Sequence, residues 1–260
     1  MNVMLIGDIS GLNGIRTTET LLPILIKEHH PDLIIANGEN SANGLGITPN
    51  TFLALKNIGI HVVTTGNHFA DKPEILRYYD PCLIRPANFS ADYPGHGYTT
   101  ITVGNSEVCV INLAGREHMP PVDCPFYTAD SIIRETHTKS EIIIIDFHAV
   151  STTEKNALAW YLDGRCSCLV GTHTHIQTAD ERILPHGLGY ISDLGMVGPW
   201  NSVLGVDPRC MIEYYRKGVA DNFRLAEGLS VFCAIIVGID EKTGKTKRIK
   251  RIQNFFKHLN

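Results

Sequence analysis

Short hydrophobic runs recur in the first third of the chain, and amphipathic segments separate them. Residues 3–6, 33–36 and 61–64 are apolar runs followed by glycine or polar residues, a pattern typical of buried parallel strands. Between them, residues 17–30 carry apolar side chains at helical spacing, and residues 48–57 begin with threonine and proline, a typical helix start. This alternation predicts an α/β fold in which helices cover a parallel sheet.

The rest of the chain adds strands of a different arrangement. Residues 98–103 and 107–113 are two short strand patterns joined by Gly104-Asn105, which predicts an antiparallel hairpin. Further helices are predicted for residues 128–138 and 153–162, and further strands for residues 142–145, 168–170, 230–239 and 247–252. We see no repeat, low-complexity stretch or linker, so residues 1–260 are expected to form a single domain.

Polar side chains follow several of these strands at the point where each strand ends. They are Asp8, Glu39, Asn40, Asn67, His68, His148, His173 and His175. Ligands of open α/β sheets bind at the carboxyl ends of the strands, so a parallel sheet would bring these residues to one edge. Taken alone, each has a structural explanation, such as a turn or helix cap for Asp8. Together, carboxylates, carboxamides and imidazoles form a mixed nitrogen and oxygen set that suits Mn, Fe or Zn.

Composition narrows the class of protein. The 23 Lys and Arg against 27 Asp and Glu give a net charge of −4, so we expect no stable nucleic-acid partner. Seven cysteines without framework spacing indicate a reduced protein. Residues 1–6 lack the pattern of a signal peptide, and the longest apolar stretch is about half a membrane span. A cytoplasmic protein without membrane contact is therefore expected.

The motifs of two large enzyme classes are absent from the sequence. It contains neither the phosphate-binding loop of nucleoside triphosphatases nor the Gly-x-Ser-x-Gly motif of serine hydrolases. Cys166-x-Cys168 has no partner pair, and strand alternation explains it better than a metal site. The strand-end residues therefore remain the principal candidates for chemistry.

The order of these motifs resembles that of the calcineurin-like metallophosphoesterases. The motifs are Gly7-Asp8, Gly38-Glu39-Asn40, Gly66-Asn67-His68, His148 and Gly171-Thr172-His173-Thr174-His175. More narrowly, the chain resembles the YmdB-like branch of bacterial phosphodiesterases, with support from residues 85–89, 112–116, 172–180 and 193–199. The resemblance extends from residue 1 to about residue 252. It implies a four-layer α/β/β/α sandwich around two mixed sheets.

The same resemblance implies two metal ions per chain, with Fe or Mn favoured and Zn compatible with the donor types. Asp8 and His175 are implied as ligands of the first ion, with Asn40 as a further candidate. Asn67, His148 and His173 are implied as ligands of the second ion. Glu39 is implied to bridge the two ions. His68 matches the proton donor of the family. Arg85 and Arg116 are candidates for phosphate contacts or for structural salt bridges. Residues 192–205, with Met196 and Trp200, are candidates for the rim of the site or for an interface or surface loop.

The implied activity is metal-dependent hydrolysis of a small phosphodiester, namely a 2′,3′-cyclic and/or 3′,5′-cyclic nucleotide, through a hydroxide that bridges the metals. The family includes homo-oligomers, and the sequence leaves the number of subunits open. Two alternatives are a non-catalytic regulatory protein that binds metal and nucleotide, and a mononuclear zinc hydrolase that acts on an amide. Turnover of a phosphodiester and the number of metal ions per chain distinguish them.

Three positions depart from the motifs of relatives. Asp8-Ile9-Ser10 lacks the histidine that the wider superfamily has two places after the aspartate, and Asn40 is a candidate substitute. Gly66-Asn67-His68-Phe69 lacks the acidic residue of the superfamily. Val150 stands where close relatives tend to have glutamate. The change at Val150 can alter substrate contacts or the local charge, but it does not remove an implied metal ligand.

Overall fold

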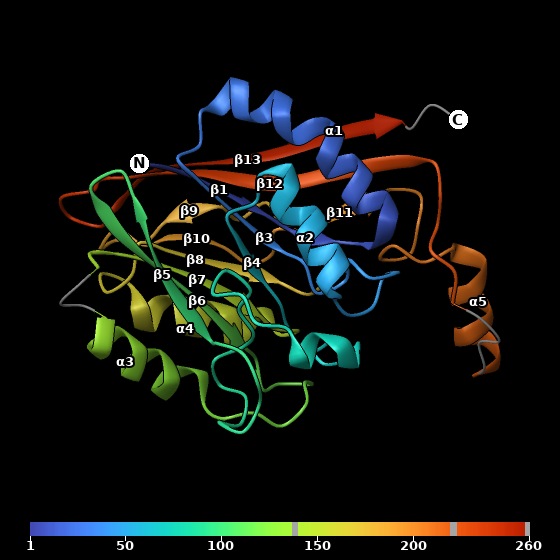
Figure 1. The fold of residues 1–260 in the computed structure, drawn as a ribbon, viewed down its shortest axis with the longest axis horizontal. Coiled ribbons are helices and arrows are strands. Elements are labelled where there is room, and N and C mark those ends of the chain that lie inside the picture. The colour runs from blue at the N-terminus through green and yellow to red at the C-terminus, as the bar shows by residue number, and fades with distance from the viewer. Residues whose placement is uncertain (137–139, 219–222, 258–260) are drawn as a thin grey trace.

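Two mixed β-sheets face each other, with helices on their outer faces, in a computed structural model that describes residues 1–136, 140–218 and 223–257 (Figure 1). The helices are α1 (Gly11–His29), α2 (Pro49–Ile58), α3 (Pro125–Thr136), α4 (Thr152–Leu162) and α5 (Pro208–Lys217), with a 3-10 helix at Pro73–Arg77. The α/β/β/α sandwich implied by the resemblance is confirmed. Among the described residues, no helix has the length and apolar character needed to cross a membrane.

The seven-stranded sheet contains the first strands of the chain. Its order is β2-β11-β12-β1-β3-β4, with β13 paired to β12. The strands are β1 (Asn2–Ile6), β2 (Asp8–Ile9), β3 (Leu33–Asn37), β4 (Val62–Thr64), β11 (Met196–Pro199), β12 (Leu229–Ile239) and β13 (Thr246–Lys257). β1, β3 and β4 are parallel, as predicted. β12 is antiparallel to β1 and makes the sheet mixed.

The six-stranded sheet has the order β5-β6-β7-β8-β10-β9. Its strands are β5 (Tyr98–Val103), β6 (Ser106–Ala114), β7 (Ile142–His148), β8 (Cys168–Thr172), β9 (Arg182–Ile183) and β10 (Gly189–Ile191). β5 and β6 form the predicted antiparallel hairpin. β6, β7, β8 and β10 are parallel, so their carboxyl ends lie at the same end of the sheet.

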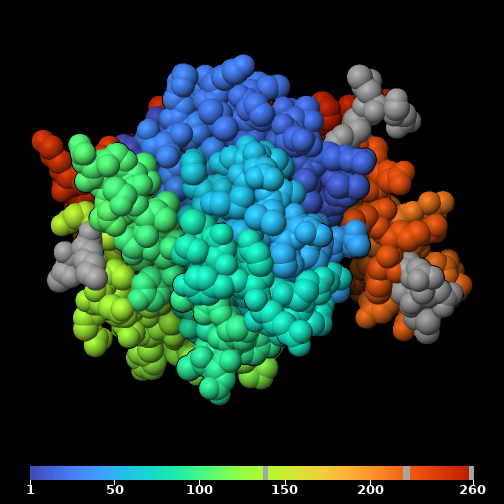
Figure 2. All heavy atoms as spheres, viewed as in Figure 1, coloured from blue at the N-terminus to red at the C-terminus, as the bar shows by residue number. Residues whose placement is uncertain are grey.

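Strand alternation builds three hydrophobic layers. In β1, Met4 and Ile6 pack with residues of α1 and α2, whereas Val3 and Leu5 belong to the layer between the sheets. In β7, the first and third isoleucines face the opposite sheet, and the second and fourth pack with α3 and α4. Because both faces of the inner strands are covered, strands such as β1, β3 and β7 contain unbroken apolar runs. In Figure 2, the blue atoms of α1 lie at the top of the face in view, and the lighter blue atoms of α2 lie below them.

Some element boundaries differ from the sequence-based expectation. α1 begins at Gly11 rather than at residue 17, because Gly14 lets the helix approach β11; a Cβ at Gly14 would lie 2.4 Å from the Val197 carbonyl oxygen. The predicted end of the third helix, Thr138, lies outside the described residues. The sequence analysis missed α5 and the short strands β2, β9, β10 and β11.

Candidate metal centre

The eight polar residues lie at the carboxyl ends of strands in both sheets. The seven-stranded sheet supplies Asp8, which follows the end of β1 and begins β2, Glu39 and Asn40 after β3, and Asn67 and His68 after β4. The six-stranded sheet supplies His148 at the end of β7 and His173 and His175 after β8. The first expectation of a single sheet edge was therefore wrong. The side chains meet where the two sheets face each other, because the carboxyl ends of the parallel strands of both sheets lie at the same end of the molecule.

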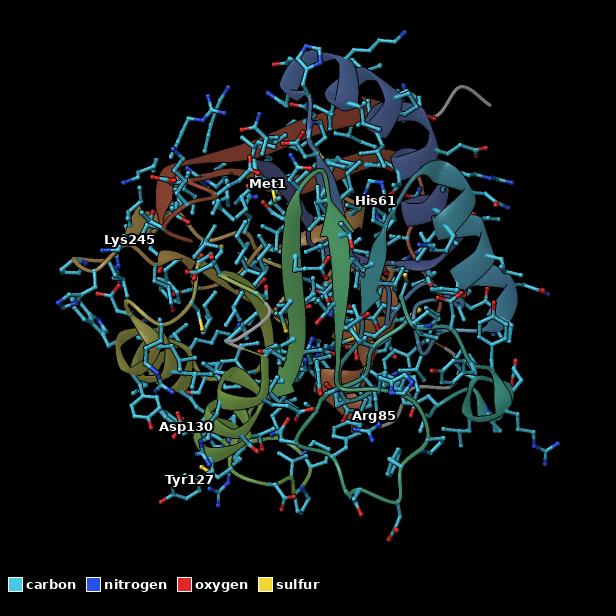
Figure 3. The ribbon with its side chains drawn as sticks, turned by 60° about the vertical axis from the view of Figure 1, so that its left-hand side comes forward. Met1, His61, Arg85, Tyr127, Asp130 and Lys245 are labelled. Carbon is cyan, nitrogen blue, oxygen red and sulfur yellow. The ribbon has the colours of Figure 1, made fainter. Side chains whose placement is uncertain are left out.

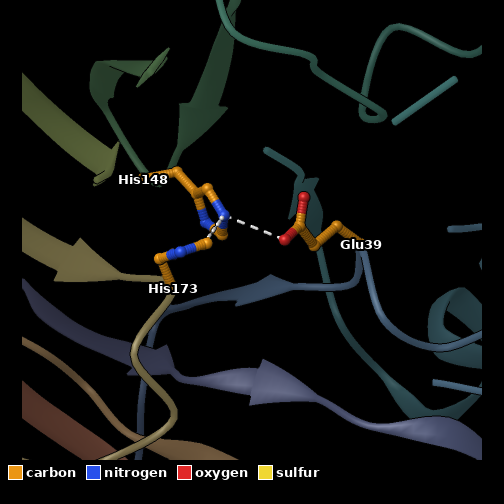
Figure 4. Close-up of side chains that lie close together, drawn as sticks. All are labelled: Glu39, His148 and His173. Carbon is orange, nitrogen blue, oxygen red and sulfur yellow. Dashed lines mark hydrogen bonds and ion pairs between the residues drawn. The ribbon is translucent and has the colours of Figure 1, made fainter. Parts of the chain in front are cut away.

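His148 is the centre of the first group of contacts. Its Nε2 atom lies 2.9 Å from Glu39 Oε1, 3.1 Å from Asn67 Oδ1 and 3.0 Å from His173 Nδ1. Figure 4 shows the contacts of Glu39 and His173 converging on the same end of the His148 ring. Glu39 and His148 have no solvent exposure. Donor atoms of Glu39, His148 and His173 lie within 4.8 Å of one another and can hold a metal ion.

The other side of His148 determines where its proton lies. The Thr172 hydroxyl donates its hydrogen to Asp146 Oδ1 at 2.7 Å, so the Thr172 oxygen can only accept from His148 Nδ1, which is 2.9 Å away. Thr64 and Asn37 also donate to Asp146. His148 therefore carries a proton on Nδ1, and its Nε2 faces Glu39. A hydrogen bond of this kind is the usual support of a metal-binding histidine.

This arrangement demands a positive charge at His148 Nε2. With a neutral ring, the Nε2 lone pair and a carboxylate oxygen would face each other in a buried space. Burial alone would lower the pKa of His148, but the carboxylates of Glu39, Asp8 and Asp146 raise it to about 9. Burial likewise opposes ionisation of Glu39, yet the His148 imidazole lowers the Glu39 pKa to about 2. The positive charge between His148 Nε2 and the Glu39 carboxylate can come from a proton or from a metal ion.

The distances fit a metal ion. Donor atoms bound to one ion at about 2.0–2.2 Å lie roughly 3 Å apart along an edge of the coordination shell. The three contacts of His148 Nε2 are 2.9 to 3.1 Å long. Glu39 Oε1 lies 2.9 Å from His148 Nε2, but it has no hydrogen-bond partner, because the two groups are not aligned as a donor and an acceptor. An orphaned carboxylate oxygen in this place is the expected state of a metal ligand.

A second group of contacts surrounds Asp8. Asp8 Oδ2 accepts the backbone N–H of His173, whereas the buried Oδ1 has no hydrogen bond. His175 Nδ1 donates to the Leu204 carbonyl at 2.9 Å, which leaves His175 Nε2 3.8 Å from Asp8 Oδ1. The Asn40 amide nitrogen is 3.1 Å from the same Nε2. With that amide turned by 180°, its oxygen would take this place and complete a second set of donors.

Burial is the main influence on the pKa of Asp8. It raises the Asp8 pKa to about 6, although the imidazoles of His175 and His148 act in the opposite direction. Burial and the neighbouring His148 lower the pKa of His173 to about 3, so His173 is neutral at physiological pH. Two carboxylates and three imidazoles thus share a space in which their charges are strongly coupled.

The loop after β8 has strained backbone. β8 ends at Thr172, and His173 and His175 have φ angles of 100° and 63°. Both histidines therefore lie in a turn that follows the strand, and not in the strand itself. Buried Asp193 holds the turn by accepting from Thr174 N at 3.0 Å and Lys155 Nζ at 2.9 Å. Strain supported by a buried ion pair is common at functional sites.

A glycine allows the two sheets to meet closely. A Cβ atom on Gly66 would lie 2.2 Å from His148 Cδ2 and 2.5 Å from Glu39 Oε2. Any other residue at this position would displace both side chains. Gly66 is therefore required by the space that His148 and Glu39 occupy.

His68 contacts the group through its backbone. Its N–H donates to Glu39 Oε2 at 3.0 Å. Its imidazole Nδ1 is paired at 2.7 Å with Asp71 Oδ2, which orients the ring. The sequence reading missed Asp71; its position three residues after His68 was the available signal. The reading also missed Lys155, although Lys155, Leu158, Ala159 and Leu162 share the buried face of α4.

Two sequence interpretations are corrected here. Arg85 is buried and donates to the carbonyl oxygens of Pro86, Tyr93 and Pro94, so it supports a loop and does not present its charge to a phosphate (Figure 3). The segment 192–205 is largely structural, because Met196 is buried in β11 and Trp200 packs against Phe255. Two carbonyl groups of this segment contact candidate ligands: Leu204 O accepts from His175 Nδ1, and Gly195 O accepts from the backbone N–H of Asp8.

Residues 4–252 match the family model described as YmdB-like protein. The chain belongs to this family. It is 43% identical over 254 residues to a protein of Bacillus subtilis (strain 168) named 2′,3′-cyclic-nucleotide 2′-phosphodiesterase, with 97% of this chain and 96% of the relative covered. The family resemblance inferred from the motifs is confirmed.

Solved structures give the same result for the fold. A protein from Thermus thermophilus, described as hypothetical, is 34% identical with a TM-score of 0.91, over 98% of this chain and 99% of the other. A phosphatase from Mycoplasma pneumoniae is 29% identical with a TM-score of 0.92, over 98% and 93%. The metal-ligand roles of seven of the eight strand-end residues and the proton-donor role of His68 stay predictions.

Proposed function

We propose that this protein is a metal-dependent phosphodiesterase that hydrolyses cyclic nucleotides, either 2′,3′-cyclic or 3′,5′-cyclic. The name of the Bacillus subtilis relative supports the first of these substrates. The observation that carries the proposal is the buried contact of Glu39 and Asn67 with His148 Nε2, next to an Asp8 oxygen that has no hydrogen bond. Burying carboxylates without partners costs free energy, and bound cations would compensate for this cost.

Two ions per chain account for both groups of contacts. Asp8, Asn40 and His175 would hold one ion, Asn67, His148 and His173 the other, with Glu39 shared. Nitrogen and oxygen donors favour Fe or Mn and are compatible with Zn. Such ions, when bound, neutralise phosphoryl oxygens and make a water nucleophilic at neutral pH.

The chain itself supplies orientation and a proton. In hydrolysis, the water oxygen forms a bond to phosphorus, and the bond from phosphorus to one ribose oxygen breaks. His68 would give a proton to that departing oxygen, with Asp71 holding the ring in position from Nδ1. Thr172 and Asp146 keep the His148 proton on Nδ1, so that Nε2 stays available toward Glu39.

Turnover by the purified protein tests the proposal. The protein, supplied with Mn or Fe under anaerobic conditions, is expected to hydrolyse 2′,3′-cyclic AMP or 3′,5′-cyclic AMP, and chromatography identifies the product. Glu39→Gln should remove this activity, and Glu19→Gln, an exposed position on α1, should retain it. Nucleotide binding without turnover would instead favour a regulatory protein. One metal ion per chain with amide hydrolysis would favour a zinc amidohydrolase.

A further inference from the structure

A pocket of about 180 Å³ lies directly beside the candidate metal centre. Asn67 belongs to both, because it lines the pocket and its Oδ1 is 3.1 Å from His148 Nε2. The other lining residues include Phe89, Tyr93, Met119 and Pro120. A molecule that reaches Asn67 can therefore extend into this pocket without crossing another part of the protein.

The lining is aromatic and apolar. The rings of Phe89 and Tyr93 are 5.3 Å apart in an edge-to-face arrangement, and the Tyr93 side chain is 40% exposed. Met119, Pro120, Pro121 and Val122 line the pocket as well. Flat aromatic groups gain favourable contact with such surfaces, and nucleic-acid bases stack on them in many proteins.

Buried hydrogen bonds hold both lining segments in place. The Arg85 guanidinium donates to Tyr93 O at 2.8 Å and to Pro94 O at 3.1 Å. Asn88, also buried, donates to Ala114 O at 2.8 Å and to Asp123 O at 2.9 Å. Arg85 thus fixes the segment with the two rings, and Asn88 fixes the start and end of the segment that carries Met119. A pocket formed in advance costs less to fill.

We propose that this pocket binds the base of a cyclic nucleotide whose phosphate lies at the metal centre. The inference rests on the proposed function. Sites for whole drug-sized ligands have volumes of about 300–1,000 Å³, so 180 Å³ suits one ring system and leaves the sugar and phosphate outside. Apolar and aromatic surfaces recognise the face of a base and not its hydrogen-bonding edge. The presence of a base should therefore matter more than its identity.

A substrate without a base tests this inference. We would compare kcat/KM for 2′,3′-cyclic AMP and 2′,3′-cyclic UMP with that for methyl riboside 2′,3′-cyclic phosphate, in which a methoxy group replaces the base. Stacking of one base is typically worth roughly a 5- to 150-fold change in affinity. We expect the base-free substrate to be poorer by a factor in this range, and the two nucleotides to differ less from each other.

Variants of the pocket separate recognition from chemistry. Tyr93→Ala and Met119→Ala should raise KM for both nucleotides, leave kcat nearly unchanged and leave the base-free substrate unaffected. Tyr127→Ala is the matched control, because Tyr127 is 76% exposed on α3 and does not line this pocket. Met119→Ala gives a second measurement that does not depend on the loop of Tyr93.

The outcomes distinguish the inference from the proposed function. Equal kcat/KM for the nucleotides and the base-free substrate would overturn the base pocket and leave the phosphodiesterase activity intact. Equal loss on all three substrates in both pocket variants would overturn it too. If the wild-type protein hydrolyses neither these three substrates nor 3′,5′-cyclic AMP, the proposed function fails, and the base pocket fails with it.

Discussion

Two adjoining regions of the molecule are built in different ways. Glu39 and His148 are fully buried, and hydrogen bonds from both sheets set their positions. The aromatic pocket beside them is formed by loop segments, and its Tyr93 ring is partly exposed. The core therefore fixes the groups proposed for chemistry, whereas loops provide the proposed recognition. Changes in the first region should alter metal binding and kcat, and changes in the second should alter KM.

Glu39→Gln is expected to have the largest effect. It removes the only carboxylate that contacts His148 Nε2 directly within the described residues, and with it the anion shared by the two proposed ions. We expect a loss of at least about 10²–10³-fold in kcat, the range for removing one strong electrostatic stabiliser. Steady-state kinetics measures it. Wild-type kcat in this variant would contradict the proposed role of Glu39.

His68→Ala tests proton donation separately from metal binding. The imidazole contacts Asp71, and only the backbone of His68 contacts Glu39, so the metal content should stay at the wild-type value. The expected loss in kcat is about 10²–10⁴-fold. Elemental analysis and kinetics are run on the same samples. His118→Ala, at an exposed histidine, is the control; full activity of His68→Ala would exclude the proposed acid.

Thr172→Val tests the support of His148. Valine cannot accept from His148 Nδ1, so the ring would lose the contact that places its proton. Losses of about 10–100-fold in metal affinity are typical for such outer contacts. Thr174→Val is the matched control, because the contact of the Thr174 hydroxyl is with the local Ile176 N–H and not with a histidine. Equal metal affinity in both variants would show that Thr172 has no part in positioning His148.

Metal binding should release protons. The pKa of His148 is raised to about 9, so the metal-free protein carries an extra proton there at pH 7 that a metal ion must displace. Metal affinity should therefore increase with pH up to about pH 9. Below about pH 6, Asp8 is protonated as well and more protons should be released. Calorimetry in buffers of different ionisation enthalpy measures this number, and zero release at pH 7 would contradict the assignment.

Much of the fold was predictable because each strand carries its own signal. The four successive isoleucines of β7 and the hairpin at Gly104 follow from local pattern alone. α5 was missed, although Asp207-Pro208 and Gly218 mark its start and end, because it buries no residue and has no core-facing stripe to recognise. The short strands β9 to β11 have too few residues to show a period.

The sequence predicted which residues form the candidate centre, but it did not predict how they are arranged in space. Residues such as Asp8 and His148 are visible as polar groups after apolar runs, whereas the meeting of two sheets depends on packing between distant segments. Lys155 and Asn88 were missed because their partners are known only from the fold, whereas the spacing of Asp71 from His68 was a signal in the sequence. The single domain, cytoplasmic location and homo-oligomeric state stay predictions.

Counting metal ions tests the central claim most directly. The protein would be purified anaerobically and its metal content per chain measured by elemental analysis, with Glu39→Gln measured alongside. We expect two ions per chain of Fe, Mn or Zn in the wild-type protein and fewer in the variant. One ion or none in active wild-type protein would contradict the account, because both groups of buried donor atoms could not then be filled.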